Sequence, residues 1–282
     1  MIQEISPLLN ILLLSLIASL GTGVGGLLAI IRKPGRRSYG LLMGITAGVM
    51  ICLSFLELIN KAWEMAGPWI ASAGFGMGAT FMFLLDHFAP HIRFGEKEIS
   101  RQDNQVHSKC PPEKHQGWRH RFGRRHHENR ILDPKLVNTG LLLAVGITLH
   151  NLPEGIAVGA GYLHQPQFGL FIAAAILLHN IPEGMATALP LCKGGVSRMN
   201  ALKVAFLSGF AEPLGALLAS SLLVSFQNLV PGALAFAGGV MVFITLDELI
   251  PTAREYGHQH YTAIGIILGS MFVFALSGFF GI

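Results

Sequence analysis

Two short segments of the sequence carry the same set of potential metal-binding side chains. The string LHNLPEGIAVG recurs 29 residues later as LHNIPEGMATA, with seven of eleven positions identical. In each copy a histidine and a glutamate are four residues apart, His150 with Glu154 and His179 with Glu183. On a helix this spacing puts both side chains on one face, about one turn apart. Two facing helices would then supply four nitrogen and oxygen ligands, a set that suits zinc, with iron or manganese as alternatives.

Other polar residues of these segments predict a second ion. Asn151 and Asn180 lie about 100° round their helices from the histidines, where they would serve an oxygen-richer ion, with the glutamates bridging both ions. Glu212, in the string GFAEPLG, is interpreted as a further carboxylate ligand of that ion. Pro153 and Pro182 predict kinks that free the carbonyls four residues earlier. The alternative is two kinked helices whose polar groups only bond to each other, and the duplication of the motif argues against it.

The rest of the chain has the composition of a membrane protein. Only 13% of its 282 residues are charged, 51% are hydrophobic, and the mean hydropathy is +0.53. That charged share is about half of what globular proteins use. A helix that spans a bilayer needs about 20 mostly apolar residues. Eight stretches meet this requirement, at about 7–31, 38–61, 68–91, 135–163, 167–191, 199–226, 231–253 and 260–281.

The distribution of basic residues predicts the orientation of these spans. All but one of the 20 Lys and Arg residues lie in odd-numbered connections, and Lys61 is the exception. Positive charge collects on the cytoplasmic side, so we expect both termini outside. Glu4, rather than a basic segment, precedes the first span, which we therefore interpret as a retained helix and not a signal peptide.

Residues 93–134 have a soluble-type composition without hydrophobic periodicity, which predicts a disordered cytoplasmic loop. The loop contains five histidines, His107, His115, His120, His126 and His127. Clustered imidazoles bind zinc or copper, so the loop is interpreted either as a metal-collecting tract or as a solvated basic linker. The expected organisation is three helices in residues 1–92, this loop in 93–134, and five helices with the metal centre in 135–282.

A second, fainter repeat relates the spans on either side of the central pair. Residues 47–59, AGVMICLSFLELI, align with residues 238–250, GGVMVFITLDELI, at an offset of 191. The expected fold is therefore an all-α membrane protein, with eight transmembrane helices in a 3+2+3 bundle. The two central spans cross the membrane in opposite senses, so their repeat is inverted. Inverted repeats with a site near the midplane are typical of secondary transporters.

Ionisable residues toward the ends of other spans are candidates for the ion pathway. Glu57 and Glu248 are repeat-related and are expected near opposite mouths, with Asp247 next to the second. They are interpreted either as entrance and exit stations or as interfacial salt-bridging groups. The third span ends in another such group, composed of Asp86, His87 and His91. This group predicts either an exit or regulatory site or an ordinary solvated helix end.

At these residues the sequence resembles the ZIP (Zrt-/Irt-like protein) family of divalent-metal transporters, specifically its GufA-like branch. The resemblance covers nearly all of the chain, and the paired LHNLPEG and LHNIPEG motifs are highly specific. It implies movement of zinc, and often of iron, manganese or cadmium, into the cytoplasm, together with dimers and elevator-like alternating access. It also implies that the first ion is held by His150, Glu154, His179 and Glu183. The second ion would be held by Asn151, Glu154, Asn180, Glu183 and Glu212.

Two other functions fit the same residues. Zinc with a glutamate general base can hydrolyse bonds, so an intramembrane metalloenzyme is the main alternative. Both glutamates are needed as ligands, which favours transport, and we expect no catalytic residues. A selective metal channel is the second alternative. The expected partners are divalent metal ions and the lipid bilayer, with no nucleic acid, and the expected location is the plasma or inner membrane.

Overall fold

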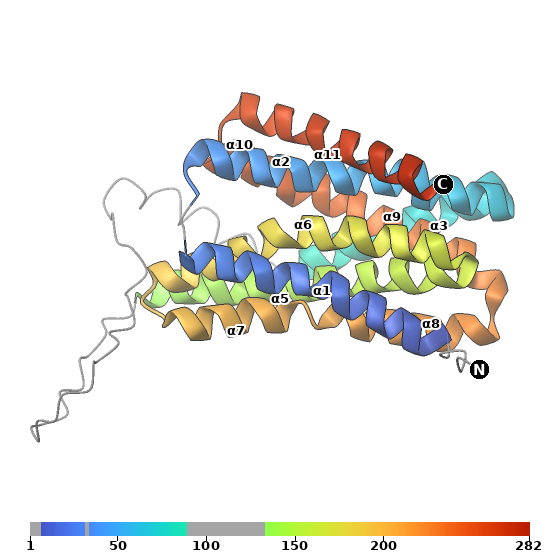
Figure 1. The fold of residues 1–282 in the computed structure, drawn as a ribbon, viewed down its shortest axis with the longest axis horizontal. Coiled ribbons are helices and arrows are strands. Elements are labelled where there is room, and N and C mark those ends of the chain that lie inside the picture. The colour runs from blue at the N-terminus through green and yellow to red at the C-terminus, as the bar shows by residue number, and fades with distance from the viewer. Residues whose placement is uncertain (1–6, 32–33, 89–132) are drawn as a thin grey trace, which may run out of the picture.

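A computed structural model of the protein describes residues 7–31, 34–88 and 133–282, and every regular element in these ranges is helical (Figure 1). The predicted all-α membrane class is confirmed. Seven helical stretches are long and apolar enough to cross a membrane. The predicted loop and His91 lie outside the described residues, and so do Arg32 and Lys33 of the first connection.

The elements follow one another along the chain with few connecting residues. The long helices are α1 (Pro7–Ile31), α2 (Arg36–Cys52), α3 (Asn60–Phe88), α5 (Pro134–His164), α6 (Pro166–Lys193), α7 (Arg198–Ser208), α8 (Ala211–Ser225), α9 (Val230–Ile244) and α11 (Gln259–Phe280). The shorter elements are the π-helical segments η1 (Leu53–Ile59) and η3 (Thr245–Leu249), the 3-10 turn η2 (Gln227–Leu229) and α10 (Ile250–Tyr256).

The second and third predicted spans form one helical stretch that is interrupted at Gly67. The stretch covers 52 residues, and at about 1.5 Å per residue this is more than twice the thickness of a bilayer. Gly67 has φ 80° and ψ 175°, a conformation that favours glycine, and Pro68 follows it. Seven stretches therefore supply enough helix for eight crossings. Consistently, α1 begins and α11 ends at the same end of the molecule (Figure 1).

The helices divide into two groups by their contacts. We call α1, α5, α6, α7 and α8 the central bundle, because each of them packs against others of this set. The second group, which we call the flanking bundle, contains α2, η1, α3, α9, η3, α10 and α11. The bundles meet where α5 contacts α9 and where α6 contacts α2 and α11. Figure 1 shows α2, α10 and α11 together along one side of the molecule.

Glycines allow close helix packing inside each bundle. In the central bundle, a Cβ atom added at Gly155 would collide with the backbone of α8, and one at Gly184 with the backbone of α1. In the flanking bundle, Gly48 lies in the same way against α11, and Gly78 against α9. Among the glycines that the structure describes, none makes such a contact from one bundle to the other. Small residues let membrane helices approach closely, so this tight packing holds each bundle together without joining the two.

The two π-helical segments occupy equivalent places in the fainter repeat. Shifting η3 back by the repeat offset of 191 places it at residues 54–58, within η1. These segments contain Glu57 and Glu248, the repeat-related acidic pair. The sequence pattern did not predict either segment, because an apolar run has the same composition in an α-helix and in a π-helix. Single π-helical turns are frequent at functional sites.

The sixth predicted span differs from expectation because it consists of two helices. The structure ends α7 at Ser208 and begins α8 at Ala211, with a break at Gly209 and Phe210. Pro213 explains the position of the break, because it has no N–H and its ring crowds the carbonyl four residues earlier. By contrast, α5 and α6 continue as helices through the prolines of their repeated motif.

Candidate metal centre

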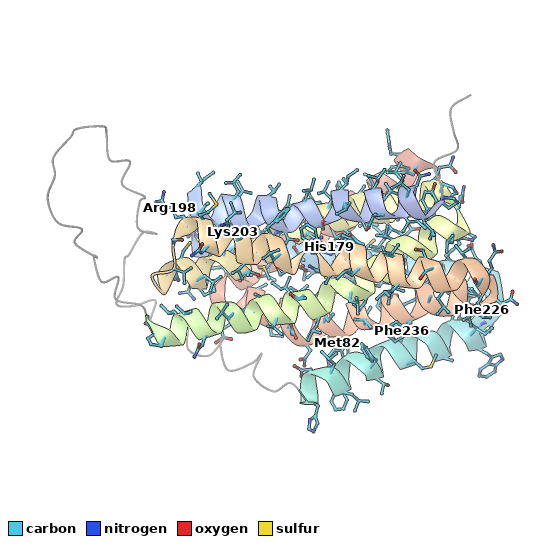
Figure 2. All side chains as sticks on the ribbon, turned by 90° about the horizontal axis from the view of Figure 1, so that it is seen from below. Met82, His179, Arg198, Lys203, Phe226 and Phe236 are labelled. Carbon is cyan, nitrogen blue, oxygen red and sulfur yellow. The ribbon has the colours of Figure 1, made fainter. Side chains whose placement is uncertain are left out.

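All seven predicted metal ligands are buried in the central bundle. Three come from α5, three from α6 and one from α8, namely His150, Asn151, Glu154, His179, Asn180, Glu183 and Glu212. Figure 2 shows His179 about midway between the end of the molecule that carries Arg198 and Lys203 and the end that carries Phe226. The cluster thus lies at mid-depth among apolar helices, where an ionisable side chain is costly and marks a functional site.

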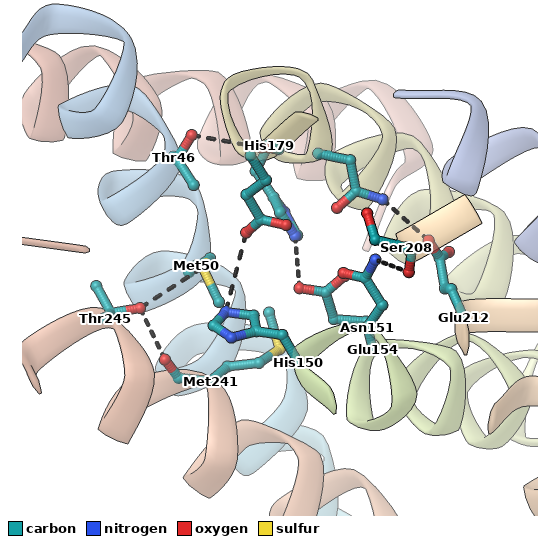
Figure 3. Close-up of polar contacts among 12 residues, drawn as sticks. Thr46, Met50, His150, Asn151, Glu154, His179, Ser208, Glu212, Met241 and Thr245 are labelled. Atoms are coloured by element: carbon teal, nitrogen blue, oxygen red, sulfur yellow. Dashed lines mark hydrogen bonds and ion pairs between the residues drawn. The ribbon is translucent and has the colours of Figure 1, made fainter. Parts of the chain in front are cut away.

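The histidines and glutamates pair across the two central helices. His179 Nε2 lies 2.9 Å from Glu154 Oε1, and His150 Nε2 lies 3.9 Å from Glu183 Oε1 (Figure 3). Each histidine therefore faces the glutamate of the other helix, as an inverted repeat requires. His150, Glu154 and Glu183 each offer one ligand atom, and these three atoms lie within 4.8 Å of one another. Ligand atoms about 2 Å from a shared ion lie about 3–4 Å apart, so a small contraction would let one ion bind them.

The two asparagines are held by their amide nitrogens. Asn151 Nδ2 donates to the carbonyl of Ser208 at 3.0 Å. Asn180 Nδ2 donates to the carbonyl of Ala18 at 3.2 Å and to Glu212 Oε2 at 2.9 Å. These bonds fix both side chains and leave their Oδ1 atoms without a hydrogen-bond partner. The structure thus brings Asn180 and Glu212 together and holds an asparagine oxygen ready on each central helix.

Each of the seven side chains has at least one buried polar atom that makes no hydrogen bond. These atoms are His150 Nε2, Asn151 Oδ1, Glu154 Oε2, His179 Nδ1, Asn180 Oδ1, both oxygens of Glu183 and Glu212 Oε1. Leaving a buried polar atom unpaired costs about 1–3 kcal/mol. A concentration of such atoms at one place therefore calls for a bound group, and this mixture of imidazole, carboxylate and amide donors suits a divalent cation.

The flanking bundle approaches the centre with residues that the sequence analysis did not select. Thr46 Oγ1, on α2, donates to the main-chain carbonyl of His179 at 3.4 Å. Thr245 Oγ1 lies 3.7 Å from the Met50 sulfur and donates to the Met241 carbonyl at 2.7 Å. Figure 3 includes these residues in the close-up that shows His150. The fainter repeat contained a signal for the methionines, because Met50 and Met241 are identical partners in it.

The repeat-related acids of the π-helical segments lie outside the central cluster. Glu57 and Glu248 are both half-buried. Glu248 is close enough to Glu183 for the two carboxylates to interact electrostatically, whereas Glu57 interacts with Lys61 and Glu64. One acid therefore neighbours the centre, and the other neighbours the charged residues at the start of α3.

The remaining candidate residues are placed apart from one another. Asp247 is half-buried in η3. Asp86 is buried near the end of α3, and the next residue, His87, is exposed with its ring stacked on Phe83 at 6.1 Å. The structure does not bring these three residues into the central cluster.

A bundle of apolar helices around a buried set of nitrogen and oxygen donors defines a multi-pass membrane protein of the metal-handling class. The sequence profile of the ZIP zinc transporter family matches residues 69–277, and the chain belongs to this family. The predicted family is confirmed. Because this is a family of transporters and not of enzymes, its membership favours transport over the metalloenzyme alternative.

Bacterial relatives match along almost the full chain. The chain is 37% identical to the zinc transporter ZupT of Akkermansia muciniphila, over 94% of this chain and 95% of that protein. It is 39% identical to the ZupT of Corynebacterium efficiens, over 94% of each chain. The ZupT of Chlorobium luteolum is also 39% identical, over 94% of this chain and 96% of the relative.

Proposed function

We propose that this protein moves divalent metal ions, chiefly zinc, through the membrane into the cytoplasm. The observation that carries the proposal is that seven buried side chains in one cluster each present an unpartnered donor atom. The similar bacterial proteins are named zinc transporters, which supports zinc as the main substrate. Iron, manganese and cadmium accept the same nitrogen and oxygen donors and are proposed as secondary substrates.

We assign two ions to the centre. His150, Glu154, His179 and Glu183 would hold the first ion, since their side chains already pair across α5 and α6. The second ion would bind on the side of the asparagines. Its ligands would be Asn151, Asn180 and Glu212, together with Glu154 and Glu183, which bridge the two ions. A bridging carboxylate lowers the repulsion between two neighbouring cations, because its negative charge lies between them.

Transport would proceed by movement of the central bundle against the flanking bundle. Backbone contacts at glycines hold each bundle together and are not found between the bundles among the described residues. Larger side chains make the contact instead, such as Phe171 on α6 against Phe280 on α11, with ring centroids 6.2 Å apart. Such an interface can slide without breaking either bundle, so the ions would reach the two membrane faces in turn.

Acidic residues outside the centre would guide ions to and from it. We propose Glu57 as a station on the outer side, and Glu248 with Asp247 as a station on the cytoplasmic side. The electrostatic contact between Glu248 and Glu183 supports the second assignment. Asp86, His87 and His91 are proposed as a cytoplasmic exit group. With both termini outside, the protein would lie in the plasma or inner membrane as a homodimer.

Metal uptake by the purified protein in liposomes tests this function. We expect saturable zinc uptake, whereas flux linear in zinc concentration would indicate a channel. Glu154→Ala and Glu183→Ala should each abolish uptake, because each removes a ligand shared by both ions. Glu255→Ala, which removes an exposed carboxylate of α10, is the matched control and should leave uptake unchanged. Normal uptake by either centre variant at equal protein content would contradict the shared site.

The number of bound ions tests the two-ion assignment separately. Asn180→Ala or Glu212→Ala should reduce the bound zinc from two ions to one per chain, measured by anomalous scattering or elemental analysis. Loss of both ions in these variants would mean that the two sites are inseparable and the ligand assignment is wrong.

A further inference from the structure

The structure extends the internal symmetry to α1 and α7–α8, which the sequence comparison did not connect. Ala18 and Ser208 accept hydrogen bonds from Asn180 and Asn151, the two repeat-related asparagines. These acceptors are 190 residues apart in the sequence. Each asparagine is thus held by the same kind of main-chain carbonyl, one from the first span and one from the sixth.

Glycine contacts obey the same offset. A Cβ atom added at Gly25 would collide with the carbonyl oxygen of Ile181, and one at Gly215 with that of Leu152. Gly25 and Gly215 are again 190 residues apart, and Leu152 and Ile181 are 29 apart, as the central motif requires. The pairs α1–α6 and α8–α5 therefore pack by one rule, and their residues correspond one to one.

This correspondence pairs Thr22 with Glu212. A Cβ atom at Gly184 would collide with the carbonyl of Thr22, and one at Gly155 with the carbonyl of Glu212. One three-helix unit thus presents a carboxylate to the centre where the other presents a hydroxyl. No pattern in the sequence relates these two residue types, so only the contacts reveal the pairing.

The Thr22 hydroxyl is fully buried and makes no hydrogen bond. A buried hydroxyl in a helix normally bonds to a carbonyl of the preceding turn, as Ser15 of the same helix does with Ile11 at 3.0 Å. For Thr22 the carbonyl four residues earlier belongs to Ala18 and already accepts from Asn180. The hydroxyl instead lies against Gly209, where an added Cβ atom would be 2.8 Å from it.

The surroundings of this hydroxyl belong to the second ion. Gly209 directly follows Ser208, whose carbonyl holds Asn151, and Ala18 holds Asn180 one turn before Thr22. A threonine hydroxyl reaches about 2.5 Å less far than a glutamate carboxylate, because it is two C–C bonds shorter. One water molecule has about the size needed to fill this difference.

We infer that Thr22 is a further residue of the second metal site, in which its hydroxyl holds a water ligand opposite Glu212. This inference rests on the proposed two-ion function. It explains why the hydroxyl is unpaired, and it assigns a role to the unequal residue at an otherwise symmetric position.

The inequality also limits the charge of the centre. Two divalent ions carry four positive charges, against three from the carboxylates of Glu154, Glu183 and Glu212. A carboxylate at Thr22 would complete neutrality and hold the second ion more firmly. A neutral hydroxyl leaves one positive charge in excess, which favours release of an ion that must be delivered and not stored.

Zinc binding to the purified full-length protein tests the role of Thr22. Thr22→Val keeps the shape and removes the hydroxyl, so the second ion should bind about tenfold more weakly, the usual effect of one lost hydrogen bond to a ligand shell. Thr22→Ser should bind within about twofold of the wild type. Thr22→Asp should bind the second ion about tenfold more tightly and should transport zinc more slowly. Ser15→Ala, which removes a buried hydroxyl of the same helix, is the control and should change neither property.

The opposite directions of two variants separate this role from a structural one. If Thr22 only supported packing, Val and Asp would both weaken binding and lower the unfolding temperature. Unchanged affinity of Thr22→Val for the second ion would overturn the inference while leaving the transport function intact. A wild-type protein that binds a single zinc ion would overturn both the inference and the two-ion centre.

Discussion

The central and flanking bundles use the same packing rule but differ in where they place polar residues. Both bring their helices into contact at glycines, such as Gly184 in the central bundle and Gly48 in the flanking bundle. The central bundle buries the complete set of candidate ligands at mid-depth. The flanking bundle places its acids, Glu57 and Glu248, in π-helical segments outside the cluster.

This difference separates two tasks within one membrane protein. A bundle that carries the cargo must keep its ligands in fixed geometry, which the paired contacts of α5 with α8 and of α6 with α1 provide. A bundle that frames the pathway needs polar groups toward its ends and an apolar face toward the cargo. Four predictions test this division, from the largest expected effect to the smallest.

A cross-link between the bundles should stop transport, whereas one inside a bundle should not. Phe171→Cys with Phe280→Cys bridges α6 and α11, whose rings lie 6.2 Å apart. Asn10→Cys with Tyr162→Cys bridges α1 and α5 within the central bundle, at a hydrogen bond of 2.8 Å. Both pairs would be joined by a reducible reagent in a protein without native cysteines. Zinc uptake should vanish for the first pair and return on reduction, and persistent uptake in its linked form would refute relative movement of the bundles.

Substitution of a contact glycine should unfold the bundle to which it belongs. Gly184→Val and Gly78→Val place side-chain atoms against the backbone of a neighbouring helix, so each should lower the free energy of unfolding by about 1–3 kcal/mol or more. Gly76→Val is the control on α3, since an added Cβ atom there has no neighbour within 4 Å. Thermal unfolding in detergent measures the effect. Equal stability of the Gly76 and Gly78 variants would show that the glycine contacts do not hold the bundle.

Removal of the hydroxyl that links the bundles should change transport modestly without lowering stability. Thr46→Val loses the bond from α2 to the His179 carbonyl, which should change zinc uptake about two- to fivefold. Thr46→Ser retains the hydroxyl and should behave as the wild type. Thr262→Val provides the comparison within the flanking bundle, where the hydroxyl bonds to the Ala253 carbonyl at 3.0 Å. An equal effect of both valine variants on uptake would remove the special role of Thr46.

Deletion of about residues 100–130 should have the smallest effect on uptake. This segment, which lies outside the described residues, has no apolar periodicity and is expected to contribute nothing to either bundle. Its histidines can still concentrate or sense zinc in cells, so the measurement should use liposomes, where cellular feedback is absent. A variant that inserts normally but carries no zinc would place the loop in the transport machinery.

The sequence was sufficient to group the candidate ligands because it states the central motif twice. The H-x-x-x-E spacing fixes one helix face, and two copies fix two faces that must meet, which the pairing of His179 with Glu154 bears out in geometry. The helical class followed equally directly from composition. Thr22 escaped notice because its role depends on which carbonyls are already occupied by Asn180 and Asn151. Hydrogen-bond occupancy of this kind is a property of packed helices and leaves no trace in a single sequence.

The irregular points of the helices were also beyond sequence reasoning, for a different reason. The break before Glu212 follows from Pro213, but Pro153 and Pro182 sit inside helices that continue. Whether a proline ends a helix in a membrane depends on how neighbouring helices satisfy the freed carbonyl. The neighbours of each span are known only once the bundle is assembled.

The matching π-helical segments record the history of the chain. A π-helical turn holds one more residue than the α-helix it interrupts, and it persists only where that extra residue is kept. Two separate insertions at the same register of two helices would be a coincidence, whereas one insertion copied by duplication accounts for both η1 and η3. The extra residue therefore belonged to an ancestral three-helix unit before that unit was doubled and fused. The acid that it carries, now Glu57 and Glu248, was present in the ancestor as well.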